Sequence, residues 1–275
     1  MRSTDPKVPA LAASLGALAG FCSLAWAFLA SGTVFGTTVA TSVDGWLASD
    51  GTTAAPASAA FTIWFPIYLG LAGYLLWQFL PRNRGVQLHQ LIRPWAIASV
   101  VLNALWLQMI QWNQLGLSLV VMLLLATVLI TVVRLISTQV LYSATDRWIT
   151  RATFGIYLGW ILIAAIANLI AWLSSLQYEA LTELLKTATA LLILLAGLAI
   201  GALTFKNPMG IYVNAGSLWA VTWIAVARFN GPLHSASVGL CASVAAALML
   251  ICLLTSVRHR VPRLVGEVLG RRRHR

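Results

Sequence analysis

The chain has 275 residues, of which 60% are hydrophobic and 9% are charged, and its formal net charge is +11. Soluble domains carry about 25% charged residues, so this chain has too little charge to cover a surface that faces water. The composition excludes a soluble globular domain and predicts an integral membrane protein whose solvent is lipid.

The apolar residues gather in runs that are long enough to cross a bilayer as helices, which takes about 20 mainly apolar residues each. The third and fourth runs are separated only by a tight connection around Asn113 to Gly116, so we expect them to form a helical hairpin. The runs predict an all-α polytopic bundle of about eight transmembrane helices at 9–31, 60–80, 94–112, 115–137, 152–174, 185–205, 209–228 and 234–257.

The basic residues mark one side of this predicted bundle. If every run crosses the membrane, 16 of the 18 Lys and Arg residues fall on one side, and only Lys186 and Arg228 fall on the other. Because basic residues concentrate in cytoplasmic loops, we expect a multi-pass protein of the cytoplasmic cell membrane with both termini in the cytoplasm. The basic residues are spread over short connections and a tail, so they predict topology and no nucleic-acid partner.

Two segments outside the spans stand out. The connection 32–59 on the outer side is the longest, and loops beyond about 12–15 residues tend to be functional lids or disordered segments. The sequence leaves open a lid over an outward-facing pocket and a mobile linker. The tail 258–275 is rich in arginine and is expected to anchor on anionic lipid.

Glycines four residues apart predict close approach of helices, because small residues let two backbones come together. This spacing occurs at Gly16/Gly20, Gly155/Gly159 and Gly197/Gly201.

The predicted spans hold no Asp, Glu or His in their middle, where proton-coupled pumps and metal transporters normally place such groups. The sequence has no CxxC pair, HExxH motif or P-loop, and Cys22, Cys241 and Cys252 lie inside apolar runs as small hydrophobic residues. We therefore expect no catalytic residues, no metal site and no required cofactor.

Aromatic and amide side chains form a stripe on the fifth span instead. At about 100° per residue, Tyr157, Trp160, Ala164, Asn168 and Trp172 fall within an arc of about 120°. Such a stripe in a membrane helix points to a neighbouring helix or to a ligand.

Two more spans carry similar pairs. Trp64 and Tyr68 share a face of the second span, and Asn103 and Trp106 share a face of the third. Two interpretations stay open: the amides hydrogen-bond between helices and the indoles pack or lie at the membrane interface, or these groups converge on a pocket.

The motifs on these spans resemble the translocator-protein family, also called the tryptophan-rich sensory or peripheral benzodiazepine receptor family (TspO/MBR). Trp64-Phe65-Pro66-Ile67-Tyr68 resembles its second helix, where a Tyr follows a Trp by four residues. Leu102-Asn103-Ala104-Leu105-Trp106 resembles its third-helix motif Leu-Asn-x-x-Trp. The sequence Tyr157-Leu158-Gly159-Trp160, followed by Ala164, Asn168 and Trp172, matches the fifth-helix motif at every spacing.

The resemblance covers residues 9–176 and has three departures. The Pro-rich, Trp-containing stretch before the second helix is absent, and Ile156 stands where the family usually has Pro. Spans six to eight have no counterpart in five-helix members, so the chain resembles a longer, eight-helix bacterial branch. The expected organisation is a five-helix region with its outside loop, three additional helices and a basic tail, at 1–176, 177–257 and 258–275.

The resemblance implies a pocket that binds porphyrins and, in some members, sterols or synthetic aromatic ligands. By position, Trp64, Asn103, Trp160 and Ala164 would line this pocket. Four residues would flank it or fix helix packing, namely Tyr68, Trp106, Tyr157 and Asn168. Indole rings offer flat apolar faces to a planar macrocycle and an N–H to a carboxylate or carbonyl.

The leading hypothesis is a membrane ligand-binding protein that acts as sensor, carrier or regulator for a planar hydrophobic ligand such as a porphyrin or another tetrapyrrole. Its expected partners are the bilayer and this small ligand, with a homodimer left open. The first alternative is a membrane enzyme acting on an isoprenoid, a pigment or a tetrapyrrole. The second is a secondary transporter, for which mid-membrane charges and a visible inverted repeat are missing.

Overall fold

The computed structural model describes residues 20–27, 38–39, 41–80, 83, 85–138 and 144–273, with side chains described for all of these except 79, 144, 180 and 260–273. The described residues form helices and no strands, and seven segments are long and apolar enough to cross a membrane. The long helices are α2 (Trp64–Phe79), α3 (Gln87–Gln111), α4 (Leu115–Thr138), α5 (Ala144–Ser175), α6 (Glu179–Lys206), α7 (Gly210–Asn230) and α8 (Ala236–Arg273).

These helices confirm the predicted all-α, multi-pass membrane fold. Six of the predicted spans correspond to α3–α8, and the span at 60–80 is divided between the 3-10 helix η3 (Ser58–Ile63) and α2. The predicted first span lies mostly outside the described residues, of which 20–27 are helical.

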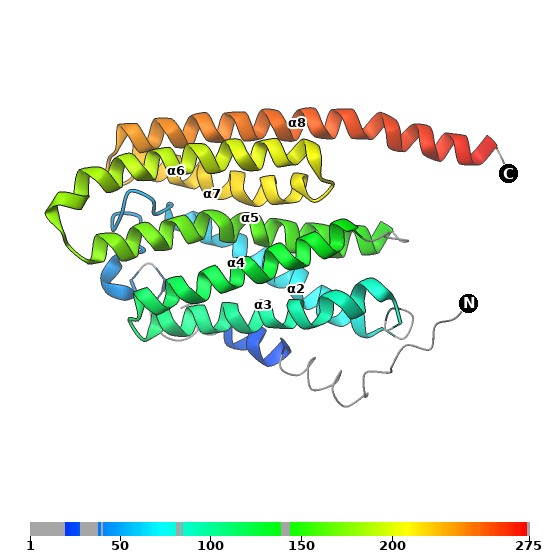
Figure 1. Cartoon of the computed structure of the whole chain (residues 1–275), viewed down its shortest axis with the longest axis horizontal. Helices are drawn as coiled ribbons and strands as arrows, with labels where there is room; N and C mark the ends of the chain where they lie inside the picture. The colour runs from blue at the N-terminus through cyan, green and yellow to red at the C-terminus, as the bar shows by residue number, and fades with distance from the viewer. Residues whose placement is uncertain are drawn as a thin grey trace.

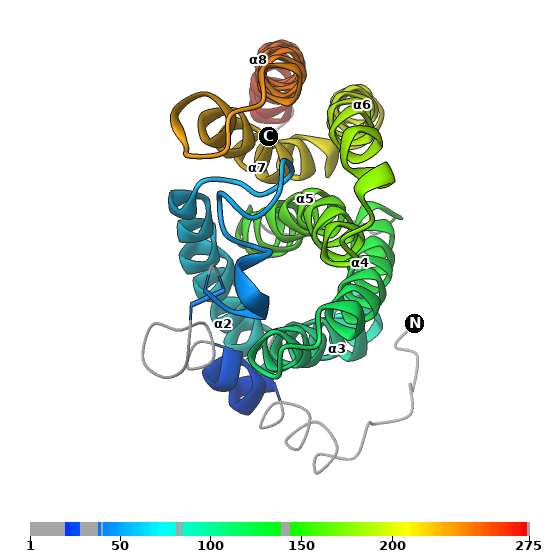
Figure 2. The ribbon, with the colours of Figure 1, turned by 90° about the vertical axis from the view of Figure 1, so that its left-hand side faces the viewer.

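The helices run side by side and alternate in direction along one long axis (Figure 1). Viewed along that axis, α5 lies between α2, α3 and α4 on one side and α6, α7 and α8 on the other (Figure 2). Helix α5 packs on α4 and α2 and also on α7, while α6, α7 and α8 pack on one another. We call the end that carries residues 41–63 the loop end and the opposite end, where α8 reaches Arg273, the basic end.

Several helices are longer than the apolar runs that predicted them. Helix α3 begins at Gln87 rather than 94, and α5 begins at Ala144 rather than 152. Helix α8 continues through the arginine-rich segment to Arg273. A hydropathy pattern marks the lipid-facing length of a helix, but polar residues such as Gln, Arg and Lys are good helix formers, so the backbone stays helical beyond it.

The predicted hairpin between α3 and α4 is confirmed. Asn113 adopts the left-handed conformation, with φ of 58°, which Asn tolerates better than most residues. The N–H of Gln114 donates to the carbonyl of Met109 at 2.9 Å. This closed turn brings α4 back along α3.

Close packing at glycines joins α5 to α7. A Cβ on Gly159 would lie 2.0 Å from the carbonyl oxygen of Val213, and one on Gly216 would lie 2.2 Å from that of Ile156. Ser217 donates a hydrogen bond of 2.8 Å to the carbonyl of Gly159. The prediction of close approach is thus confirmed for Gly155/Gly159.

Of the other two glycine pairs, the structure describes both residues of Gly197/Gly201 but only one residue of Gly16/Gly20. On the α6–α8 contact, a Cβ on Gly197 would lie 2.7 Å from that of Ala245, which confirms close packing there. Of the pair Gly16/Gly20, Gly16 lies outside the described residues.

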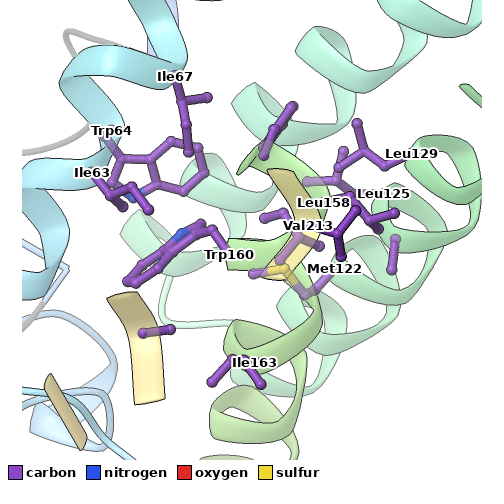
Figure 3. Packing of buried hydrophobic residues seen from close by; sticks show 14 of the residues in the cluster. Ile63, Trp64, Ile67, Met122, Leu125, Leu129, Leu158, Trp160, Ile163 and Val213 are labelled. Carbon is purple, nitrogen blue, oxygen red and sulfur yellow. The ribbon is translucent and has the colours of Figure 1, made fainter. Parts of the chain in front are cut away.

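A continuous apolar core fills the space between these helices. In Figure 3, Trp64 and Ile67 of α2 lie beside Trp160 of α5, and Leu125 of α4 lies near Leu158 of α5. The core therefore places α5, with its aromatic stripe, between the other helices and away from lipid.

Candidate ligand-binding site

A cavity lies at the loop end of the bundle. The volume that the centre of a water molecule can occupy inside it is about 30 Å3, so the cavity is small while the loop covers it. Its wall is mostly apolar with a few polar groups, as is typical of ligand pockets. The cavity is lined by Val39, Leu47, Ala55, Pro56, Phe61, Trp106, Trp160, Ile163, Ala164, Ala167, Asn168, Ala220 and Ile224.

The eight residues predicted for the site lie together, but they divide between two layers. Four of them line the cavity, namely Trp106, Trp160, Ala164 and Asn168. The other four, Trp64, Tyr68, Asn103 and Tyr157, are not among its lining residues. The resemblance implies that Trp64 and Asn103 line the pocket, but they do not line this cavity. It implies that Trp106 and Asn168 flank the pocket or fix helix packing, but they line this cavity.

Trp64 is the centre of the second layer, and its ring fills the space between α2, α3 and α5. Its centroid lies 5.2 Å from that of Tyr68 and 6.2 Å from that of Trp106, in stacked arrangements. The rings of Tyr157 and Trp160 meet it edge-on at 5.9 Å and 6.2 Å. Because Trp64 is enclosed by these four rings, its own faces are occupied by the protein.

Asn103 is held in the second layer by its amide nitrogen, whereas its Oδ1 is buried without a hydrogen-bond partner among the described residues. Its Nδ2 donates to the hydroxyl of Tyr68 at 3.1 Å, linking α3 to α2. The hydroxyl of Tyr157 donates to the carbonyl of Ser99 at 3.3 Å, linking α5 to α3. These bonds hold the second layer behind the lining residues.

Asn168 supplies the amide of the cavity wall. Its Oδ1 accepts hydrogen bonds from Trp106 Nε1 at 3.4 Å and from Ser118 at 3.3 Å. Its Nδ2 donates to the carbonyl of Ala164 at 3.1 Å. A buried amide that is satisfied in this way can fix the orientation of its neighbours without the cost of an unpaired group.

Trp160 differs from Trp106 in having a free donor. Its Nε1 is buried and has no hydrogen-bond partner among the described residues. The ring stands edge-on to Trp64, as Figure 3 shows, and edge-on to Phe61 at 5.8 Å. An unsatisfied N–H on a cavity residue is a donor that a polar atom of a ligand would satisfy.

The described part of the long loop covers the cavity. Val39, Leu47, Ala55 and Pro56 contribute to its wall, and Leu47 and Ala55 are buried. This part of the loop is folded onto the bundle, which favours the lid over the mobile linker. Residues 32–37 and 40 of the predicted loop lie outside the described residues.

Helix α7 holds this cover in place. Trp219 Nε1 donates to the carbonyl of Ala60 at 2.9 Å, and the N–H of Ala57 donates to the carbonyl of Trp223 at 3.1 Å. Ala220 and Ile224 of the same helix line the cavity. Helix α7 lies beyond the five spans that the motifs cover, so sequence reasoning missed its part in the site.

Arg228 is a further residue that sequence reasoning missed. It is buried, and its Nη2 donates to the carbonyls of Ser49 and Ala55 in the loop. The sequence did contain one indication of its role, because Arg228 is one of only two basic residues on the less basic side of the predicted bundle.

The model of the TSPO-like protein family matches residues 16–255, which is most of the chain. The chain belongs to the TSPO-like protein family. No curated protein and no solved structure was found to match it.

The match extends well beyond the motifs. They cover residues 9–176, whereas the match runs through α6 and α7 and into α8. The helix that closes the cavity of this TSPO-like protein is therefore within the part of the chain that matches the family.

A second polar cluster of this TSPO-like protein lies at the basic end. Asp146 accepts hydrogen bonds from Trp77 Nε1 at 2.7 Å and lies 3.3 Å from His89 Nε2. The predicted spans leave His89 and Asp146 in connections, but the structure places them in the first turns of α3 and α5, with His89 fully buried. The cluster links α2, α3 and α5 at the end opposite the cavity.

Proposed function

We propose that this TSPO-like protein binds a planar hydrophobic ligand, such as a porphyrin or another tetrapyrrole, in the cavity at the loop end and acts as a sensor, carrier or regulator of that ligand. The observation that carries the proposal is the wall formed by Trp106, Trp160, Ala164 and Asn168 under a folded loop. These four residues come from the third-helix and fifth-helix motifs, which reach the same cavity from α3 and α5.

The chemistry of the wall suits such a ligand. Indole rings give flat, polarisable surfaces, and aromatic pairs contribute about 0.5–1.5 kcal/mol beyond the area that they bury. Ala164 leaves space next to Trp160, since it has no side chain beyond Cβ. The unpaired N–H of Trp160 provides one donor for orientation.

The position of the cavity suits a ligand that arrives at the outer side of the membrane. The loop that covers it is held by hydrogen bonds from α7 and by buried side chains such as Leu47 and Ala55. We propose that the ligand enters when the loop opens at this end and that the protein lies in the cytoplasmic membrane.

Titration of protoporphyrin IX into the purified protein, followed by tryptophan fluorescence, tests this proposal. We expect saturable quenching, with a Kd about tenfold higher in Trp160→Leu, since a tenfold change corresponds to about 1.4 kcal/mol. Trp95→Leu is the matched control, because Trp95 is exposed on the bundle surface and does not line the cavity. Equal Kd values for Trp160→Leu and the unmodified chain would contradict the proposed site.

A further inference from the structure

Arg228 is a buried cation whose hydrogen-bonding capacity is only partly used. Its side chain is 1% exposed. Nη2 donates to the carbonyls of Ser49 and Ala55, the latter at 3.2 Å. A guanidinium carries five N–H donors, and those on Nε and Nη1 are buried without a partner among the described residues.

The charge of Arg228 is not paired either. No ion pair joins Arg228 to a carboxylate of the described residues. Asp50 in the loop acts on Arg228 at longer range, but this residue is exposed. A buried charge is normally paired, so Arg228 is set to receive an anion.

Arg228 is not among the lining residues of the cavity, but it contacts the wall at the loop side. Ile224, one helical turn earlier on α7, lines the cavity, and residues four apart share a helix face. Ala55, which accepts a hydrogen bond from Nη2, lines it as well. The guanidinium therefore touches one wall residue and stands next to another on its own helix.

We infer that the free N–H groups on Nε and Nη1 of Arg228 bind a carboxylate of the ligand. This inference rests on the proposed function and narrows the ligand class from planar hydrophobic molecules to planar hydrophobic acids. Arginine suits the role, because its guanidinium stays charged and matches carboxylate geometry. The apolar body of the ligand lies against Trp160 and Ala164, and its carboxylate lies toward the loop.

A purely structural role for Arg228 makes a different prediction. The two bonds from Nη2 hold the loop, but Trp219 and Trp223 also hold it through Ala60 and Ala57. A residue that only clamps the loop affects stability and the binding of all ligands equally. A carboxylate site affects acids and leaves neutral analogues of the same shape unchanged.

Protoporphyrin IX and its dimethyl ester separate the two roles, since they share one ring system and differ in charge. Their Kd values are measured on the full chain in nanodiscs, each corrected for partition into empty nanodiscs, for the unmodified protein, Arg228→Gln and Lys186→Gln. Lys186 is the matched control, because it is the other basic residue near the loop end and is 43% exposed.

We expect the unmodified chain to bind the acid about tenfold to hundredfold more tightly than the ester, the range for hydrogen bonds to a charged group. Arg228→Gln brings the ratio close to one, because it removes the advantage of the acid over the ester, and Lys186→Gln keeps the ratio. A ratio that persists in Arg228→Gln overturns the inference.

Equal binding of acid and ester by the unmodified chain also overturns the inference, while the proposed function stands. This comparison needs no variant, so it can overturn the inference even where Arg228→Gln does not fold. If neither compound binds the unmodified chain, the proposed function fails and the carboxylate site fails with it.

Discussion

Trp106 Nε1 lies 3.4 Å from Asn168 Oδ1 and donates a hydrogen bond to it, which links α3 to α5. Ser118 of α4 donates to the same oxygen at 3.3 Å, so one amide ties three helices together beside the cavity. Two residues that come from different sequence motifs are thus partners in a single network. This network fixes the positions of Trp106 and Asn168 in the cavity wall in the absence of a ligand.

Removing the amide should cost stability. Asn168→Leu leaves the N–H of Trp106 buried without an acceptor, whereas Ser118 keeps its bond of 2.7 Å to the carbonyl of Leu115. Interhelical hydrogen bonds in membranes contribute about 0.6 kcal/mol on average and up to about 1.7 kcal/mol. We expect a loss of this size in the free energy of unfolding, measured by denaturant titration in mixed micelles.

A double-mutant cycle isolates the bond between the two residues. Trp106→Phe removes the donor and leaves Asn168 with Ser118. The loss in the double variant should be smaller than the sum of the single losses by about 0.5–1.5 kcal/mol, which is typical of residues in direct contact. Additive losses would mean that the two side chains do not interact.

The close contact of α5 with α7 gives a second prediction. Gly159→Ala places a Cβ 2.0 Å from the carbonyl oxygen of Val213, so the two helices must move apart. Overpacking of this kind costs about 1–3 kcal/mol, and we expect a clear fall in the thermal unfolding temperature.

Gly73→Ala is the control for this substitution. Gly73 also lies in a helix, but a Cβ there meets nothing within 4 Å. Its replacement should leave stability unchanged or raise it by up to about 1 kcal/mol, because Ala favours the helix. Equal effects at both positions would contradict the helix contact.

Membrane topology gives a third prediction. In a chain freed of its cysteines by Cys→Ala changes, Asp50→Cys and Arg258→Cys place single thiols at opposite ends of the bundle, and both positions are exposed. Since basic residues mark the cytoplasmic side, a membrane-impermeant maleimide should label Asp50→Cys in intact cells and Arg258→Cys only after permeabilisation. The reverse pattern would place the termini outside.

Much of the cavity could be predicted from the sequence, because helical periodicity gives the face that a residue lies on. The spacing of Trp160, Ala164 and Asn168 placed them on one stripe of α5, and all three line the cavity. Periodicity does not indicate whether a side chain on that face reaches the cavity or is covered by its neighbours. Trp64 was expected on the wall, but the neighbouring rings enclose it in the second layer.

The cover of the cavity could not be predicted in the same way. Leu47 and Ala55 lie in a loop without a repeating pattern, so nothing in the sequence indicates which of its side chains turn inward. Ala220 and Ile224 lie on a helix whose inward face depends on its contact with α5. Among the residues of the cover and α7, only Arg228 stands out in the sequence, because it and Lys186 are the two basic residues on the less basic side of the predicted bundle.

If the cavity at the loop end is the ligand site, a side chain that fills it blocks binding. Ala164→Phe places a ring in the cavity, whereas Ala202→Phe places one on an exposed position of α6. The measurement is the Kd for protoporphyrin IX, with the thermal unfolding temperature recorded for each variant. We predict at least about a tenfold loss of affinity for Ala164→Phe in a folded protein and no change for Ala202→Phe. Unchanged affinity in a folded Ala164→Phe variant would contradict the account.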